Sequence, residues 1–226
     1  MPHMIIFDLM GTLLDLRSID PHFERFFGDA AVRKEWWNQT LQLAMATVVT
    51  NAYEDFEVHA DTGLEITARR YTVSMLGEEK NLILGTLQKL RPFLDVAQSL
   101  QRLRDAGLTL TVLTNSTART AEAQLAFAGL REHFAEVISA DEIQCFKPAP
   151  EVYQLAAKRL GLEPGQIRLV SAHDWDVTGA LRAGCGAAFL ARPGQVMNPF
   201  GPQPDVQGTD LVEIADKMLT VELEQS

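Results

Sequence analysis

The sequence predicts an α/β fold, a doubly wound parallel-sheet (Rossmann-like) core with an inserted helical cap domain. Two observations lead to this class. Short apolar runs alternate with amphipathic helical stretches at residues 4–7 and again from about residue 92 onward. The block between them, residues 16–90, has no convincing strand and is far too long for a loop in a compact domain. We therefore expect a core formed by residues 1–15 and 91–226 and a cap formed by residues 16–90.

The core elements follow one another as strands and helices. Residues 4–7 predict a first strand that is buried on both faces, because all four side chains are apolar. Further strands are expected at residues 108–113, 167–170 and 187–190. Apolar side chains at spacings of three and four also predict helices. These lie at residues 93–103, 118–128, 150–160 and 211–218.

The charge balance limits the partners of the protein. The chain has 20 basic and 30 acidic residues, a formal net charge of −10, and such a field repels nucleic acid and anionic membranes. A small anionic substrate is compatible with it, because one site can be locally positive. No apolar run is long enough to span a membrane, and residues 1–7 lack a secretory signal pattern. Since Cys145 and Cys185 make no disulfide framework, we expect a cytoplasmic protein.

Polar side chains follow the predicted strands, at the edge where parallel sheets bind their ligands. They are Asp8 and Thr12 after the first strand, Thr114 and Asn115 after the second, and Ser171, His173 and Asp176 after the third. Lys147 lies shortly before the helix that begins at Pro150. The hydroxyl and amide at residues 114 and 115 can hold substrate oxygens.

Together these groups predict chemistry, although each has an ordinary alternative. Asp8 can act as a covalent nucleophile, and Lys147 beside it would keep the carboxylate ionised. Asp176, with Ser171 or His173, can position a water molecule. The alternatives are that both aspartates cap a turn or a helix and that the lysine is a solvated surface residue.

Four motifs, in this order, resemble the haloacid dehalogenase superfamily. They are Phe-Asp-x-x-Gly-Thr-Leu at residues 7–13, Leu-Thr-Asn at 113–115, Lys-Pro-x-Pro at 147–150 and an acidic motif at 171–176. The resemblance covers nearly the whole chain, and the helical block is similar to the mobile cap of that family. It implies a doubly wound core with the cap inserted after the first strand.

Within the superfamily, the motifs are more similar to the 2-haloacid dehalogenase subgroup than to the phosphatases. Phosphatases carry a second Asp where this chain has Met10, and a Gly-Asp pair where it has Ser171 and Ala172. Met10 can donate no proton, and Ala172 offers Mg²⁺ no side-chain oxygen. Tyr153 and residues 175–180 match the dehalogenase subgroup. The resemblance therefore implies a hydrolase that needs no metal and no cofactor.

The resemblance implies a reaction in two displacements. The nucleophile attacks the carbon that carries the halogen, water then hydrolyses the aspartyl ester, and the product is a 2-hydroxy acid. The implied catalytic residues are Asp8, Thr12, Lys147, Ser171, His173 and Asp176. The implied substrate-binding residues are Leu9, Met10, Trp37, Phe56, Thr114, Asn115 and Tyr153. The partner is a small anionic haloacid, and a homodimer is compatible with the family, although the sequence pattern indicates no self-complementary patch.

Two positions depart from the subgroup. Trp37 stands where the subgroup has a cap arginine that contacts the substrate and the departing halide. Arg33 lies one helical turn before Trp37, and it either reaches the same face or is solvated. His173 stands where the subgroup has Asn, and a neutral histidine can accept a proton from water. Asp174 adds a charge there and is expected to pair with Lys147 or with His173.

Two other functions are alternatives to dehalogenation. One is a Mg-dependent, phosphatase-like enzyme with degraded motifs, which Met10 and Ala172 oppose. The other is a non-catalytic relative, which the retained Asp8, Lys147 and Asp176 oppose, because an inactive site has no need of these three groups.

Overall fold

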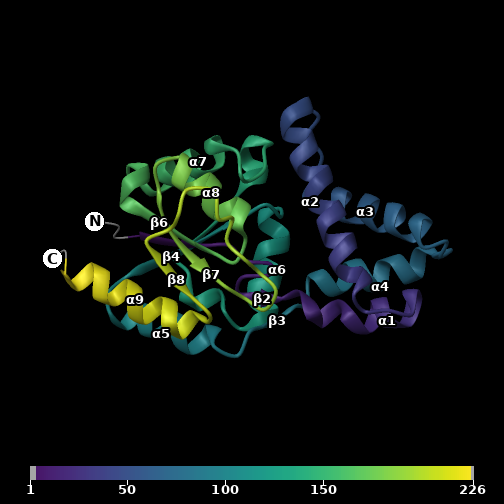
Figure 1. The fold of residues 1–226 in the computed structure, drawn as a ribbon, viewed down its shortest axis with the longest axis horizontal. Helices are drawn as coiled ribbons and strands as arrows, with labels where there is room; N and C mark the ends of the chain where they lie inside the picture. The colour runs from purple at the N-terminus through teal and green to yellow at the C-terminus, as the bar shows by residue number, and fades with distance from the viewer. Residues whose placement is uncertain (1–3, 225–226) are drawn as a thin grey trace.

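The computed structural model describes residues 4–224 and contains a parallel sheet flanked by helices, next to a separate helical block (Figure 1). Residues 1–3 and 225–226, the ends of the predicted core, lie outside the described residues. The sheet has six strands in the order β5-β4-β1-β6-β7-β8, and all its strand pairs are parallel. The strands are β1 (Met4–Phe7), β4 (Thr109–Thr114), β5 (Glu136–Ser139), β6 (Ile167–Ser171), β7 (Gly186–Leu190) and β8 (Val206–Gly208). The predicted Rossmann-like sheet is confirmed.

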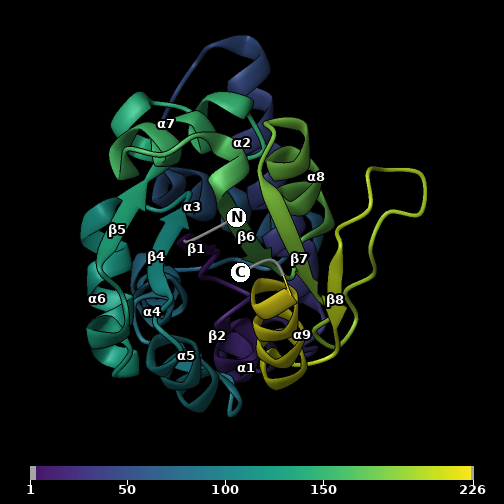
Figure 2. The ribbon, with the colours of Figure 1, turned by 90° about the vertical axis from the view of Figure 1, so that its left-hand side faces the viewer.

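Helices cover both faces of the sheet, and alternate side chains of β1 face opposite ways. Ile5 and Phe7 belong to a core cluster with side chains of α5 (Val96–Asp105), α6 (Ala118–Ala128) and α9 (Leu211–Glu224). Ile6, between them, packs on the other face with side chains of α7 (Pro150–Leu160) and α8 (Asp174–Arg182). Figure 2 shows α7 and α8 on one side of the sheet and α5 and α9 on the other. A strand in this position has to be apolar throughout.

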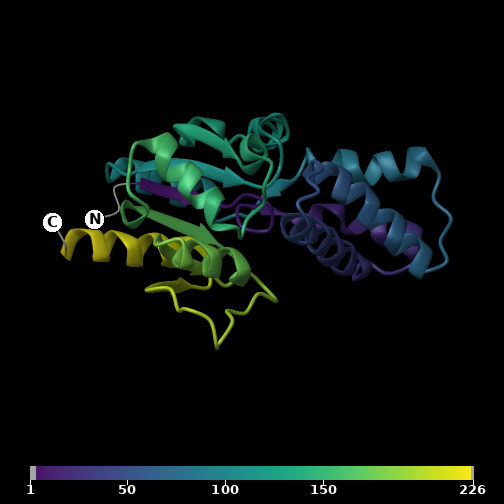
Figure 3. The same ribbon diagram turned by 90° about the horizontal axis from the view of Figure 1, so that it is seen from above.

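Residues 16–90 form a helical block beyond the carboxyl ends of the strands (Figure 3). The block contains a 3₁₀ helix, η1 (Leu16–Ile19), and the helices α1 (Asp20–Phe27), α2 (Val32–Thr50), α3 (Phe56–Arg70) and α4 (Gly77–Leu87). All of residues 16–90 are described, and none of them lies in a strand. Two chain crossings, β2 (Leu14–Asp15) and β3 (Arg91–Pro92), pair antiparallel and join the block to the sheet.

Several elements differ from the prediction, among them β5, β8 and α5. The sequence does not predict β5 or β8, which are the two edge strands of the sheet. They are short and contain the half-buried Glu136 and the exposed Gln207, because an edge strand need not be apolar throughout. The helix expected at residues 93–103 begins only at Val96. Phe93 precedes it, because its N–H donates to the Leu13 carbonyl (3.0 Å) and holds the two chain crossings together.

The helices differ in length and in how much of their surface is buried. No helix among the described residues is both long enough and apolar enough to cross a membrane.

Candidate active site

Asp8 follows the carboxyl end of β1 directly. Its N–H donates to the Val170 carbonyl of β6 (3.1 Å), which fixes its backbone at the sheet edge. Its side chain is almost fully buried, and the Thr12 hydroxyl donates a hydrogen bond to its Oδ2 (2.6 Å). The same hydroxyl oxygen accepts a hydrogen bond from the Ala172 N–H (2.9 Å). The orientation of the Asp8 carboxylate is therefore set by the loops after two neighbouring strands.

His173 supports the turn that follows Asp8. Gly11 in this turn has a φ of 83°, in the left-handed region that favours glycine, and a Cβ there would lie 3.0 Å from the His173 ring. Nε2 of His173 lies 2.9 Å from the Met10 carbonyl oxygen. Since a carbonyl only accepts, Nε2 carries the proton and donates. In this geometry Nε2 is not free to accept a proton from water, so the structure favours a positioning role for His173.

Lys147 lies between two carboxylates. Its Nζ is 2.8 Å from Oδ1 of Asp8 and 2.7 Å from Oδ2 of Asp176, and all three side chains are buried. Its backbone N–H donates to Oδ1 of Asn115 (2.8 Å), which anchors the lysine to the end of β4. The Tyr153 hydroxyl donates to the other oxygen of Asp176, Oδ1 (2.7 Å). The solvated lysine and the helix-capping aspartate considered from the sequence are therefore wrong.

In this cluster, neighbouring charges and hydrogen bonds together shift the pKa values of Asp8 and Lys147 more than burial does. Burial raises the pKa of Asp8, but the charges of Lys147 and His173 and the hydrogen bonds from Lys147 and Thr12 bring the net pKa below its ordinary value. Burial lowers the pKa of Lys147, but Asp176 and Asp8 raise it more. Burial and the neighbouring Asp176 both raise the pKa of Tyr153. The nucleophile is therefore ionised, the lysine protonated and the tyrosine neutral at pH 7.

The cluster carries an excess of negative charge before any reaction. Two buried carboxylates, Asp8 and Asp176, share the single ammonium of Lys147, so these three groups together carry a net charge of −1, and Nε2 of His173 lies 3.5 Å from Oδ2 of Asp8. A buried, uncompensated charge is unfavourable. Conversion of the Asp8 carboxylate to a neutral ester would leave a balanced pair of Lys147 and Asp176.

A small pocket opens over Asp8, between the sheet and the helical block. Its volume of about 20 Å³ is room for about one water molecule. It is lined by Asp8, Met10, Trp37, Leu41, Phe56, Thr114, Asn115, His173 and Trp175. The walls are largely aromatic, and the ring centroids of Trp37 and Phe56 are 5.7 Å apart.

The pocket contains N–H donors that are free for a ligand. Nε1 of Trp37 is buried and has no hydrogen-bond partner within residues 4–224. The neighbouring Trp36 differs, since its Nε1 donates to the Ala60 carbonyl (2.8 Å). The amide nitrogen of Asn115 makes one long hydrogen bond, to the Lys147 carbonyl (3.4 Å), so its second N–H is available. Two residues that each have a free N–H thus line the pocket that also contains Asp8.

Most of the residues predicted from the sequence come together here, but some are placed differently. Leu9 and Tyr153 do not line the pocket. Leu9 is buried and its carbonyl accepts from Leu13 and Leu14, while Tyr153 supports Asp176. Ser171 is also fully buried, and its hydroxyl oxygen accepts from the His173 N–H (3.1 Å). The side chains of these three residues therefore lie away from the pocket and act on the loops and on Asp176.

The partners of two charged residues, Asp174 and Arg33, were left open by the sequence. Asp174, the first residue of α8, forms neither predicted pair within the described part of the chain, where Lys147 pairs with Asp8 and Asp176 and His173 with Asp8. Arg33 is buried rather than solvated, and it pairs with Asp20. Two further residues line the pocket that the sequence did not predict, Leu41 and Trp175. Leu41 lies one helical turn after Trp37, which is the signal that could have identified it.

The side chains at this site do not fit Mg²⁺, which takes about six oxygen ligands in octahedral geometry. The two carboxylates of Asp8 and Asp176 are already bridged by the Lys147 ammonium, and Met10 and Ala172 add no side-chain oxygen. Within residues 4–224, no group of three or more His, Cys, Asp or Glu side chains is arranged to hold a metal ion. The chemistry has to be derived from the side chains themselves.

Comparisons with known proteins agree with this geometry. The family model of haloacid dehalogenase-like hydrolases matches residues 3–184. The (S)-2-haloacid dehalogenase of Pseudomonas sp. (strain YL) is 30% identical over 214 residues, which are 94% of this chain and 92% of that protein. The structure of L-2-haloacid dehalogenase from Xanthobacter autotrophicus superposes with a TM-score of 0.90 at 26% identity, covering 96% of this chain and 98% of that one.

A second structure of the Xanthobacter autotrophicus enzyme, with chloropropionic acid covalently bound, superposes equally well, with a TM-score of 0.90 at 25% identity. The fold, the order of the motifs and the family model all lead to the same assignment. The chain belongs to the haloacid dehalogenase-like hydrolases.

Proposed function

We propose that this protein is a metal-independent 2-haloacid dehalogenase, which converts a small 2-haloalkanoic acid and water into a 2-hydroxy acid and halide. The observation that carries the proposal is the buried, ionised Asp8, held by Lys147 and Thr12 beside a pocket with no carboxylic acid at Met10. A phosphatase needs an acid there to protonate its leaving alkoxide. Halide leaves without a proton, so this site is sufficient for dehalogenation.

The first step is a displacement at carbon 2. A carboxylate oxygen of Asp8 forms a bond to that carbon, the carbon–halogen bond breaks, and the halide departs with the bonding electrons. The products are a neutral aspartyl ester and a halide ion. The step removes the excess negative charge of the buried cluster, because only Lys147 and Asp176 stay charged. The covalently bound chloropropionic acid in the Xanthobacter autotrophicus enzyme supports an intermediate of this kind.

Two donors of this chain suit the departing halide. The unpartnered Nε1–H of Trp37 and the second amide N–H of Asn115 belong to residues that line the pocket. An indole N–H in an aromatic pocket can stabilise a developing anion without a formal charge, because water is excluded and the hydrogen bond is correspondingly strong. We propose that Trp37 performs the part for which the subgroup uses a cap arginine.

The second step hydrolyses the ester. Water attacks the Asp8 carboxyl carbon, Asp176 takes one of its protons, and the Lys147 ammonium stabilises the oxyanion that forms. When the acyl C–O bond breaks, the proton on Asp176 passes to the alkoxide and gives the hydroxy acid. The second proton of the water leaves when Asp8 ionises again. Because only the first step breaks a bond to carbon 2, the configuration at that carbon is inverted.

The helical block supplies one wall of the pocket, through Trp37, Leu41 and Phe56. We propose that residues 16–90 act as a mobile cap on a core of residues 1–15 and 91–226. The pocket over Asp8 is too small for a haloacid, which supports the need for opening before substrate enters. The carboxylate of the substrate would be held by Thr114 and by the peptide N–H groups after Asp8.

The test is halide release from both enantiomers of 2-chloropropionate and 2-bromopropionate, with a chelator present. The wild type should release halide and the Asp8→Asn variant should lose at least about 10³-fold in rate, since the nucleophile itself is removed. After several turnovers in ¹⁸O-labelled water, the label should appear in Asp8. A folded wild-type enzyme that releases no halide, but releases phosphate from phosphate esters with Mg²⁺, would contradict the proposal.

A further inference from the structure

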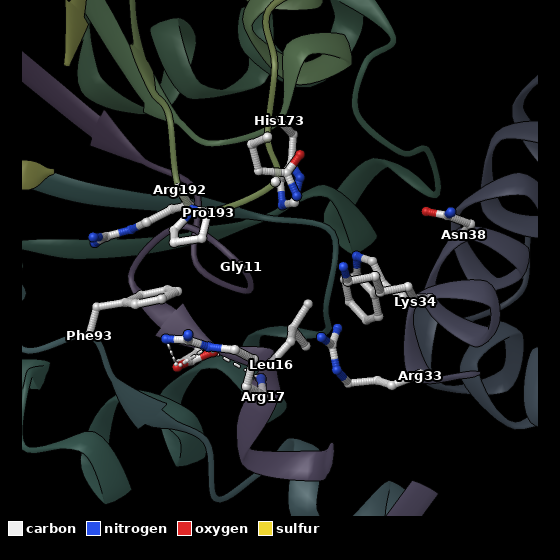
Figure 4. Close-up of a pocket in the computed structure, with 14 residues that line it drawn as sticks. Gly11, Leu16, Arg17, Arg33, Lys34, Asn38, Phe93, His173, Arg192 and Pro193 are labelled. Atoms are coloured by element: carbon white, nitrogen blue, oxygen red, sulfur yellow. Dashed lines mark hydrogen bonds and ion pairs between the residues drawn. The ribbon is translucent and has the colours of Figure 1, made fainter. Parts of the chain in front are cut away.

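A second, larger pocket adjoins the one over Asp8. Its volume is about 400 Å³, and it lies between the helical block and the loops at the sheet edge. Trp37 and His173 line both pockets, so the two pockets adjoin at these side chains. Figure 4 shows Arg33 and Lys34 reaching into the larger pocket from the helical block, opposite His173 and Arg192. A substrate with a longer chain than the small pocket can hold has this space directly beside it.

The larger pocket is basic, although the chain as a whole carries a net charge of −10. Its lining includes four cations, Arg17, Arg33, Lys34 and Arg192. Each of the three arginines has a carboxylate partner: Arg17 pairs with Asp15, Arg33 with Asp20 and Arg192 with Asp95. Within the described residues Lys34 forms no ion pair, so one positive charge is left over. A single carboxylate, with one negative charge, would balance it, and a doubly charged phosphate would exceed it.

Arg33 is the side chain best arranged to recognise such a group. It is 92% buried, since its residual exposure is 8%, and Nε donates to Asp20. Among residues 4–224 no hydrogen bond engages its two terminal nitrogen atoms. A guanidinium fork of this kind matches the two oxygens of a carboxylate. The pairing with Asp20 also holds the fork in one orientation, so little side-chain entropy is lost on binding.

We propose that this pocket binds the second carboxylate of a 2-halodicarboxylic acid, with Arg33 as its recognition group and Lys34 as the balancing charge. This inference rests on the proposed dehalogenation at Asp8. The first carboxylate and carbon 2 lie over Asp8, and the chain passes between Trp37 and His173 to the basic pocket. A third pocket, of about 280 Å³ on the other side of Met10 and Phe56, contains Glu57 and no lysine or arginine, so it does not suit an anionic tail.

The test compares diacids with monoacids of equal chain length. The three pairs are 2-chlorosuccinate with 2-chlorobutanoate, 2-chloroglutarate with 2-chloropentanoate, and 2-chloroadipate with 2-chlorohexanoate. For at least one pair, kcat/KM should favour the diacid by about tenfold or more, the scale of a hydrogen-bonded charge pair. Arg33→Gln should reduce this preference about tenfold, and Arg33→Lys should keep part of it.

The control is Arg69→Gln. Arg69 is also an arginine of the helical block whose Nε binds a carboxylate, that of Glu65 (3.0 Å), but it is exposed and lines neither pocket. Its substitution should leave the preference for diacids as it is. An equal loss in the Arg33→Gln and Arg69→Gln variants, or no preference for any diacid, would overturn the inference.

Binding of unreactive acids separates this inference from the proposed function. Calorimetry with succinate, glutarate and adipate, against the matching monoacids, requires no dehalogenation. Arg33-dependent binding of a diacid by a protein that releases no halide would sustain the pocket and refute the reaction. Turnover of monoacids without any preference for diacids would sustain the reaction and refute the diacid pocket. Equal Arg33-dependent binding of acetate or inorganic phosphate would indicate a site for free anions and would also overturn the inference.

Discussion

At the scale of single residues, two adjacent tryptophans have different environments. The Trp36 N–H is bound to the Ala60 carbonyl, whereas the Trp37 N–H has no partner within residues 4–224 and lines the pocket over Asp8. A buried donor without a partner costs free energy, which a ligand can recover. The two side chains leave α2 in different directions because consecutive residues of a helix are about 100° apart, although their rings still touch, with centroids 5.9 Å apart.

We predict that Trp37→Phe lowers kcat/KM for 2-chloropropionate about 10- to 100-fold, because the halide loses a charged hydrogen bond. Product inhibition by bromide should weaken in the same variant. Trp36→Phe is the matched control. It should lower the free energy of unfolding by about 1 kcal/mol, because the Ala60 carbonyl is left without its partner, with a much smaller effect on kcat/KM. Equal kinetic effects of both substitutions would contradict a halide contact by Trp37.

The second residue-scale prediction concerns pH and Lys147. The pKa of Asp8 is lowered, so its stabilising contribution is present above about pH 4 and is lost as the pH falls through its folded value. The pKa of Lys147 is raised, so its contribution is complete below about pH 10 and is lost as the pH rises through its folded value. Stability from this cluster should therefore be flat between these limits.

Lys147→Met should lower the free energy of unfolding at pH 7 by about 3–5 kcal/mol, because two buried carboxylates lose their shared cation. It should also raise the pKa of Asp8 and move the acid limb of any remaining activity to higher pH. Urea denaturation between pH 4 and 10 measures the first effect. Lys158→Met, an exposed lysine on α7, should change stability by no more than about 0.5 kcal/mol.

At the scale of elements, the contact between α7 and α8 keeps Asp176 in place. The helices approach closely at Gly179, where a Cβ would lie 2.6 Å from the Tyr153 hydroxyl and 2.9 Å from the Pro148 carbonyl oxygen. Real Cβ atoms do not make such contacts, so a side chain at this position has to displace Tyr153 or the backbone beside Lys147. Tyr153, which supports Asp176, and the backbone beside Lys147 can therefore keep their positions only because residue 179 has no side chain.

We predict that Gly179→Ala destabilises the protein by about 1–3 kcal/mol through overpacking and lowers kcat as Tyr153 moves away from Asp176. Gly85→Ala is the matched control, since it lies in α4 with nothing within 4 Å of the added Cβ. Because alanine favours helix, that variant should gain about 0.5–1 kcal/mol. Thermal unfolding of both variants measures the difference, and a stable, fully active Gly179→Ala variant would contradict the close approach.

At the scale of the whole molecule, the helical block and the sheet touch through contacts that would have to break in the proposed opening of the pocket. The Tyr53 hydroxyl donates to Oδ1 of Asp141, across this boundary (2.6 Å). In the proposed opening, the pair of crossings β2 and β3 acts as the hinge. Since the pocket over Asp8 holds only about one water molecule, the proposal requires that contacts like this one break before substrate enters.

Tyr53→Phe should favour the open form, because it removes one hydrogen bond that exists only in the closed form. We expect KM to rise about 2- to 10-fold, which corresponds to a bond of about 1 kcal/mol. Acrylamide should quench tryptophan fluorescence more strongly in this variant. Tyr71→Phe is the control, because the Tyr71 hydroxyl donates to Glu35 inside the helical block. Unchanged quenching in Tyr53→Phe would show that this contact does not control opening.

The sequence by itself determined the central strands, the helical insertion and the meeting of Asp8, Lys147 and Asp176 at one site. Strands buried on both faces must be apolar, and parallel strands bring their carboxyl ends to one edge, so Asp8 and Asp176 had to meet there. The edge strands β5 and β8 could not be predicted, because one unpaired side relaxes the demand for apolar residues. The start of α5 was misplaced, because periodicity does not reveal that the Phe93 backbone is bonded to Leu13.

Only the tertiary structure decided how side chains far apart in the sequence satisfy one another. Tyr153 supports Asp176 instead of lining the pocket, and His173 donates to Met10. Arg33 is buried with a free fork beside the pocket, while Trp37 keeps an N–H without a partner. Spacing along the chain fixes which residues share a strand end or a helix face. Whether a polar atom finds a partner depends on distances of a few tenths of an ångström between separate elements, which the packing of the whole molecule sets.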